Sequence, residues 1–210
     1  MTALLVIAKQ PLPGRVKTRL TPPFTPAEAA ALAEAALTDT LTAAARVPAD
    51  RHVLVLDGQP GGWLPSGFEV APQAAGGLDT RLAAAFAGCD GPALLIGMDT
   101  PQVTPELLAP ALCWDAYDAW FGPAADGGFW ALGLASPDPA LLLGVPMSRP
   151  DTGAVQYARL RTAGLRIGTL PVLRDVDTAE DARLVAGRTP GSRFAALHSA
   201  LTAASAGAGA

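Results

Sequence analysis

The chain has 210 residues, of which 50% are hydrophobic and 16% are charged. At roughly 100–200 residues per domain, this length predicts one domain with a modest tail, and the apolar content excludes wholesale disorder. Fifteen basic and nineteen acidic residues give a net charge of −4, which argues against general binding of nucleic acids or anionic membranes.

The cysteines and the N-terminus indicate a protein of a reducing compartment. Cys89 and Cys113 lie in no CxxC motif or Cys/His cluster, so we expect neither a disulfide framework nor a structural zinc site. The apolar run LLVIA is too short for a signal peptide, and no apolar stretch reaches the roughly 18 residues of a transmembrane helix. We therefore expect a cytoplasmic protein without a membrane partner.

Short apolar runs alternate with helix signals along most of the chain. In chain order, we predict a strand at 4–8, a helix at 25–47, strands at 52–56 and 68–71, a helix at 79–86, a strand at 93–98, a helix from 104, strands at 119–122 and 129–134, a helix at 152–163, a strand at 166–173 and a helix from 179. At the first helix, Thr25 is a typical N-cap, Pro26 suits the first helical position and Glu28 completes a capping box.

This alternation predicts a mostly parallel sheet with helices on both faces. In such sheets ligands bind outside the carboxyl ends of the strands, so the residues directly after each strand are the candidates for function. The last ten residues, LTAASAGAGA, have little to bury and are predicted to be disordered. We therefore divide the chain into a domain of residues 1–188 and a C-terminal extension of residues 189–210.

A basic loop follows the first predicted strand. Residues 1–20 contain four basic residues and no acidic one, and among them Lys17 and Arg19 could neutralise phosphate charge. Gly14 allows a ligand to approach the backbone, whose N–H groups can cradle a phosphate. The loop matches neither GxxxxGK[ST] nor GxGxxG, and a solvated basic turn is the alternative interpretation.

Three further segments place carboxylates or glycines after predicted strands. Asp99 follows the run ALLIGM, where a carboxylate needs a partner such as Mg²⁺, or else accepts backbone N–H bonds in a loop. The triplet Asp126-Gly127-Gly128 allows close approach of a ligand, or forms a plain turn between strands. Asp175 and Asp177 point the same way in an extended segment and could converge, although Asp177 or the Thr178 that follows could instead cap the last helix.

Taken together and in order, the segments AKQPLPGRVKTRL, IGMDTP, DGGFWALGL and DVDTAED resemble the signature blocks of an uncharacterised glycosyltransferase-A-like family. This family lies in the nucleotide-diphospho-sugar transferase superfamily and is similar to 2-phospholactate guanylyltransferase and molybdenum-cofactor guanylyltransferase. The resemblance covers residues 3–187 and implies a single Rossmann-like α/β domain of the glycosyltransferase-A type.

The resemblance also implies roles for particular residues. Asp99 is expected to bind the divalent metal, Mg²⁺ or Mn²⁺, and Asp177 to complete the metal site. The nucleotide-binding residues implied are Ala8, Lys9, Pro13, Gly14, Lys17, Arg19, Gln73 and Arg81. The triplet Asp126, Gly127 and Gly128 is expected in the acceptor or nucleotide cleft, and we expect Lys17 and Asp99 to contribute to catalysis.

These roles describe a metal-dependent transferase with a nucleotide-activated donor and a small-molecule acceptor. Nucleotidyl transfer from an NTP to a small acceptor, phosphorylated or not, is slightly favoured. Glycosyl transfer from an NDP-sugar and a non-catalytic nucleotide-binding module are the alternatives. The chain departs from the family pattern at Met147-Ser148-Arg149, where a Trp-Ser-Thr element is common, and at Phe129, where tyrosine is usual. Both departures fall on the expected acceptor side, so the sequence does not identify the acceptor. It also does not identify the base of the nucleotide or the oligomeric state of the protein.

Overall fold

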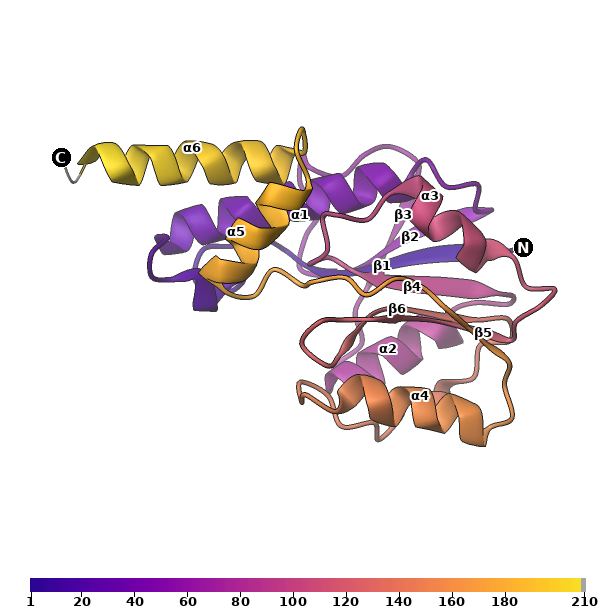
Figure 1. The fold of residues 1–210 in the computed structure, drawn as a ribbon. Coiled ribbons are helices and arrows are strands. Elements are labelled where there is room, and N and C mark those ends of the chain that lie inside the picture. Colours follow the sequence, from indigo (N-terminus) through magenta and orange to yellow (C-terminus); the bar gives the residue numbers. More distant parts are fainter. Residues whose placement is uncertain (209–210) are drawn as a thin grey trace.

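The computed structural model describes residues 1–208, and these contain seven strands and six α-helices in alternating order (Figure 1). The strands are β1 (Ala3–Lys9), β2 (Arg51–Asp57), β3 (Phe68–Pro72), β4 (Ala93–Gly97), β5 (Ala119–Pro123), β6 (Phe129–Leu134) and β7 (Ile167–Thr169). The helices are α1 (Pro26–Ala44), α2 (Leu78–Ala87), α3 (Pro105–Leu108), α4 (Thr152–Thr162), α5 (Ala179–Arg188) and α6 (Arg193–Ala208). None of these helices is both long enough and apolar enough to span a membrane.

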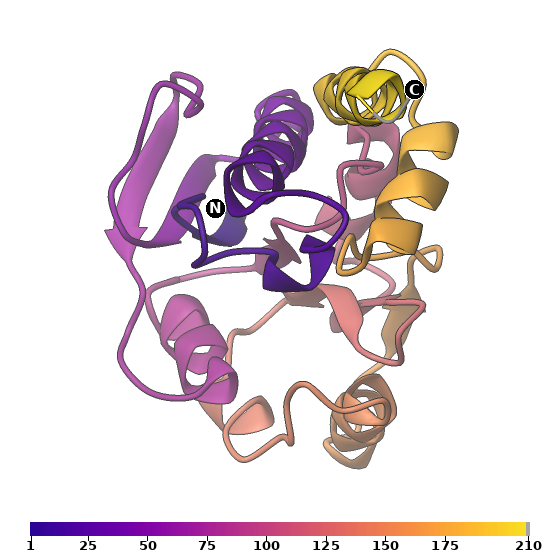
Figure 2. The ribbon, with the colours of Figure 1, turned by 90° about the vertical axis from the view of Figure 1, so that its left-hand side faces the viewer.

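All seven strands form one sheet in the order β3-β2-β1-β4-β6-β5-β7. Only β6 runs antiparallel to its neighbours, β4 and β5, and the other strand pairs are parallel. Helices α1, α3, α5 and α6 cover one face of the sheet, and α2 and α4 cover the other (Figures 1 and 2). The predicted single α/β domain with a mostly parallel sheet is confirmed.

Both faces of the sheet are packed against helices, which explains why the strands are continuously apolar. On one face, Leu4 and Val6 of β1 pack in a cluster with Leu37 and Leu41 of α1. On the other face, Leu5 packs in a second cluster with residues of α2 and α4. Burial of each such side chain contributes about 1.5–3 kcal/mol, so these two layers supply the main driving force for the fold.

The sheet register brings several strand ends to one edge. Ile7 of β1 pairs with Gly97 of β4, so the loop after β1 and the residues after β4 emerge side by side. Because β6 is antiparallel to β4, its first residue, Phe129, lies at the same edge. This edge faces the viewer in Figure 2. The basic loop after β1, Asp99 after β4 and the Asp126–Gly128 triplet before β6 belong to this edge by their place in the element order.

The late strand is shorter than predicted. The sequence predicts a strand at 166–173, whereas β7 covers only Ile167–Thr169. Pro171 has no N–H to donate to a strand ladder, and only an isolated bridge between Leu173 and Ala124 follows it. The freed segment runs on to Asp175 and Asp177 at the carboxyl edge of the sheet.

The C-terminal extension departs most from its prediction. Residues 193–208 form α6, so residues 201–208 of the segment predicted to be disordered are helical, and residues 209–210 lie outside the described part of the chain. Phe194 is fully buried in a cluster with Leu32 of α1 and Val185 of α5. The Asp39 carboxylate accepts hydrogen bonds from the backbone N–H groups of Arg193 (3.2 Å) and Phe194 (2.9 Å), which satisfies the start of the helix. Alanine is the strongest helix former, so an alanine-rich end that finds a packing partner becomes helical.

We expect Phe194→Ala to lower the free energy of unfolding by about 3–5 kcal/mol, because it leaves a cavity between α1, α5 and α6. Val172→Ala is the matched control, since Val172 is 63% exposed, and it should change the free energy by no more than about 0.5 kcal/mol. Urea denaturation of both variants measures the difference. Equal stabilities would contradict the placement of α6 in the cooperative core.

Candidate functional site

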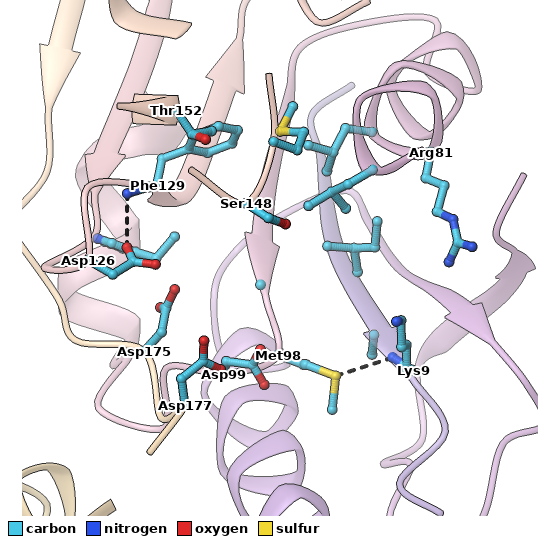
Figure 3. A pocket seen from close by; sticks show the side chains of 18 of the residues that line it. Lys9, Arg81, Met98, Asp99, Asp126, Phe129, Ser148, Thr152, Asp175 and Asp177 are labelled. Carbon is cyan, nitrogen blue, oxygen red and sulfur yellow. Dashed lines mark hydrogen bonds between the residues drawn. The ribbon is translucent and has the colours of Figure 1, made fainter. Parts of the chain in front are cut away.

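A cavity of about 840 Å³ opens at the carboxyl edge of the sheet (Figure 3). It is lined by the loop after β1, the start of α2, the end of β4, the turn before β6, the segment before α4 and the segment before α5. Ten predicted site residues line it: Ala8, Lys9, Lys17, Arg19, Gln73, Arg81, Asp99, Asp126, Gly128 and Asp177. Pro13, Gly14 and Gly127 do not line it, although all three lie in segments that border it.

Lys17 joins the two aspartates that were predicted to hold a metal. Its Nζ lies 2.8 Å from Oδ1 of Asp99 and 3.0 Å from Oδ1 of Asp177. The Lys17 side chain is only 7% exposed, and its backbone has a left-handed φ of 49°. Burial alone would lower the pKa of Lys17, but the charges and hydrogen bonds of the two aspartates outweigh it and raise the pKa. Lys17 is therefore a firmly held ammonium.

The pair Asp99 and Asp177 suits a hard cation. One oxygen of each carboxylate already converges on a single cation, the Lys17 ammonium, which acts as a stand-in for an ion at that position. Within residues 1–208, no group of three or more His, Cys, Asp or Glu side chains forms a complete metal-binding cluster. Mg²⁺ in nucleotide enzymes is held by one or two carboxylates, with phosphates and water as the other ligands. The donor set thus fits a cation shared with a bound phosphate.

Asp175 lies among the other aspartates of the cavity (Figure 3). Desolvation raises its pKa to about 7, and the negative charges of Asp99 and Asp126 add to the effect. Asp175 and Asp177, which the sequence places on the same side of an extended segment, both line the cavity. Asp175 is therefore partly protonated near neutral pH, whereas Lys17 compensates the neighbouring carboxylates.

A hydrogen-bonded network fixes Gln73 and Arg81 on the opposite side. The Gln73 Nε2 donates to the carbonyl oxygens of Ala8 (2.7 Å) and Val55 (3.2 Å). The Arg81 Nη1 donates to Oε1 of Gln73 and to Oδ2 of Asp57, both at 3.1 Å. The Arg81 guanidinium is thereby held across the cavity from the aspartates (Figure 3). Asp57 was not predicted, although its position at the end of β2 was a signal for it.

The Asp126-Gly127-Gly128 triplet is a turn locked against the start of α4. Gly127 has a φ of +90°, and a Cβ there would collide with the carbonyl of Pro150. Its carbonyl accepts a hydrogen bond from the N–H of Gly153 (2.8 Å), and Oδ1 of Asp126 accepts one from the N–H of Gly128 (2.9 Å). Gly127 is thus required by packing, while Asp126 and Gly128 face the cavity.

The segment before α4 contributes cavity residues that the sequence did not assign to the site. Met147, Ser148 and Arg149 were noted only as departures from a family pattern, and they line the cavity together with Thr152. Ser148 adopts a left-handed φ of 57°, and its side chain lies in the cavity (Figure 3). Arg15 also lines the cavity and was missed, although its place in the basic loop was a clear signal.

Residues 29–149 match the model of a family described as "Uncharacterized protein conserved in bacteria (DUF2064)". The chain belongs to this family. No curated protein matches the sequence.

Several solved structures resemble this DUF2064 protein. One, provisionally named a nucleotide-diphospho-sugar transferase, from Desulfovibrio desulfuricans G20, is 28% identical with a TM-score of 0.85, over 98% of this chain and 95% of that one. Rv0371c of Mycobacterium tuberculosis H37Rv, solved as a complex with manganese, is 21% identical with a TM-score of 0.54, over 88% and 96%. The 2-C-methyl-D-erythritol 4-phosphate cytidylyltransferase of Thermus thermophilus is 16% identical with a TM-score of 0.53, over 88% and 97%. The latter two share the fold.

The raised pKa of Asp175 predicts a stability that falls with rising pH. Between pH 4 and 7 the folded protein retains the Asp175 proton while the unfolded chain loses it, so the free energy of unfolding decreases over this range. We expect Asp175→Asn to be more stable than the wild type at pH 8 and equally stable near pH 4. Urea denaturation across this pH range, with EDTA present, measures the difference.

Asp118 is the matched control, because hydrogen bonds from Arg166 lower its pKa to about 2. The ionised Asp118 therefore stabilises the folded protein at pH values above the pKa that Asp118 has in the unfolded chain, and this stabilisation is lost only as the pH falls toward 2. Asp118→Asn should therefore be less stable than the wild type at pH 8, which is the opposite sign. A destabilised Asp175→Asn at pH 8 would contradict the burial of a raised-pKa carboxyl at this position.

Proposed function

We propose that this DUF2064 protein is a divalent-metal-dependent nucleotidyltransferase that uses an NTP and a small acceptor, phosphorylated or not. The observation that carries the proposal is the contact of Lys17 with Asp99 and Asp177 at the base of the basic loop, inside one large cavity. A cation site directly beside a cluster of basic side chains fits a donor that carries several phosphates.

Each side of the cavity has a role in this proposal. Asp99 and Asp177 would hold Mg²⁺ or Mn²⁺, and the bound ion would supply positive charge to the phosphates as negative charge develops. Lys17, Arg19 and N–H groups of the loop bind the leaving phosphates. Ala8, Lys9, Gln73 and Arg81 bind the rest of the nucleotide, for which Pro13 and Gly14 set the shape of the loop.

The proposed reaction needs no nucleophile from the protein. An oxyanion of the acceptor, such as a phosphate oxygen, placed near Asp126, Gly128 and Ser148, attacks the α-phosphorus of the NTP. A new P–O bond to the acceptor forms, the bond from the α-phosphorus to the bridging oxygen breaks, and pyrophosphate leaves. Catalysis then comes from orientation and from electrostatic stabilisation, with Lys17 and Asp99 as the catalytic residues.

Relatives give this proposal coarse support. The manganese in the Rv0371c structure is consistent with a divalent cation in this fold. The cytidylyltransferase from Thermus thermophilus carries out nucleotidyl transfer by its name, on the same fold. The similarity to guanylyltransferases implied by the sequence blocks stays a prediction, and so does the identity of the base.

Glycosyl transfer from an NDP-sugar is the second candidate. The name of the Desulfovibrio desulfuricans protein, whose fold matches over nearly the full length of both chains, favours it. The same residues serve this reaction, because the metal and the basic loop would then hold the departing nucleoside diphosphate. The two reactions differ in the product released, which makes them separable by experiment.

Incubation of the protein with NTPs or NDP-sugars, Mg²⁺ or Mn²⁺ and a panel of small acceptors tests the function. We expect pyrophosphate release, whereas free NDP would support glycosyl transfer instead. Tight nucleotide binding without turnover on any acceptor would contradict both reactions and indicate a non-catalytic nucleotide-binding module.

Asp99→Asn should bind the metal at least tenfold more weakly, since charged hydrogen-bonding partners contribute about 1.5–3 kcal/mol.

The basic loop should hold the terminal phosphates of the donor. Calorimetric titration of Lys17→Ala and Arg19→Ala with NMP, NDP and NTP should show affinity losses of roughly tenfold to a hundredfold that grow with the number of phosphates. Arg183→Ala is the control, because Arg183 forms a surface pair with Glu180 on α5, outside the cavity. Equal losses for NMP and NTP would remove Lys17 and Arg19 from the terminal phosphates.

A further inference from the structure

Lys17 occupies the position between Asp99 and Asp177 at which a cation would bind. Its Nζ contacts Oδ1 of Asp99 at 2.8 Å and Oδ1 of Asp177 at 3.0 Å, so one of the two negative charges of the proposed metal ligands is already balanced by the chain itself. The remaining basic neighbour, Arg19, lies 3.6 Å from Oδ2 of Asp177 and is 78% exposed. Lys17 is therefore the main internal counter-cation of this pair.

This placement is built into the fold. The Lys17 side chain is 7% exposed, while those of Asp99 and Asp177 are 36% and 45% exposed. All three residues line the cavity, and Lys17 is the most buried of them. The left-handed backbone at Lys17, directly before the 3₁₀ turn Thr18–Leu20, directs the lysine toward β4 and the segment before α5.

We infer that Lys17 competes with the divalent cation for Asp99 and Asp177 and must leave them before they can bind it, so that metal and donor bind cooperatively. The inference rests on the proposed function for the identity of the donor. A protein whose binding-competent state is only partly populated binds its ligand more weakly by that fraction. The apparent metal affinity of the free protein is therefore reduced by the Lys17 contacts.

The donor supplies the second half of the coupling. Once Lys17 leaves the carboxylates, its ammonium sits in a largely buried place and needs a new anionic partner. A donor phosphate beside the basic loop is such a partner, and Lys9, Arg15 and Arg19 line the same cavity. Because coupling between two ligands is reciprocal, the donor should strengthen metal binding as much as the metal strengthens donor binding.

A titration with Mn²⁺ alone tests the competition. In the absence of nucleotide, we expect Lys17→Met to bind Mn²⁺ about tenfold or more tightly than the wild type, as measured from free Mn²⁺ by electron paramagnetic resonance. Lys9→Met is the matched control, because it also removes one positive charge from the cavity. Lys9 forms no ion pair with Asp99 or Asp177, unlike Lys17. Lys17→Arg, which keeps the charge, should retain an affinity close to that of the wild type.

Thermal unfolding gives a second readout. Without metal, Lys17→Met leaves Asp99 and Asp177 without their main counter-cation, so we expect a lower melting temperature that Mn²⁺ restores. The same addition should shift the wild type less. A Lys17→Met variant that folds only with Mn²⁺ would also support the competition, and Lys17→Gln then serves for the titration. The double variant with Asp99→Asn should lose the gain in affinity.

A titration with Mn²⁺ in the presence of a non-hydrolysable NTP analogue tests the coupling. We expect the analogue to tighten Mn²⁺ binding by a larger factor in the wild type than in Lys17→Met. Equal Mn²⁺ affinities of Lys17→Met and Lys9→Met would overturn the inference, even where the wild type releases pyrophosphate. A gain specific to Lys17→Met, in a protein that releases neither pyrophosphate nor NDP, would leave the inference standing and refute the proposed function.

Discussion

The contact of one buried ammonium with two carboxylates holds the site together. Lys17 comes from the loop after β1, Asp99 from the end of β4 and Asp177 from the segment before α5. A backbone hydrogen bond from the N–H of Val176 to the carbonyl of Asp99 (3.0 Å) joins the second and third segments. Without a cation at this point, Asp99, Asp175 and Asp177 would repel one another, so the arrangement of the three segments depends on positive charge.

The sequence predicts well those features that depend on local pattern. Continuous apolar runs located the strands because both faces of the sheet are buried, and Thr25 caps α1 as its capping box predicts. The helical end of α6 was missed because low complexity was weighed above the helix propensity of alanine and the packing of Leu201 against the cluster around Phe194. The strand predicted at 166–173 was too long because Pro171, which has no N–H to donate to the hydrogen bonds between strands, was not taken as the end of the strand.

In the candidate site, too, local sequence pattern predicted which segments come together but not which side chains contact one another. The rule that ligands bind at the carboxyl ends of strands was sufficient to bring Lys17, Asp99 and Asp126 into one cavity. The direction of the Lys17 side chain was not predictable, because its hydrogen bond to Asp177 spans 160 positions and no local pattern encodes it. The pairing of Arg81 with Asp57 likewise arises only when β2 and α2 are placed together.

The charges that line the cavity are consistent with the proposal that a donor and a metal bind there together. Six Lys or Arg residues and four Asp residues line it, so the cavity is positive on balance in a protein with a net charge of −4. The raised pKa of Asp175 removes part of one negative charge near neutral pH. A polyphosphate brings more negative charge than this excess can balance, and a divalent cation that enters with it restores neutrality. In our proposal, Lys17 offsets part of the charge of Asp99 and Asp177 when no metal is bound, and it would become available to the donor phosphates when the cation replaces it.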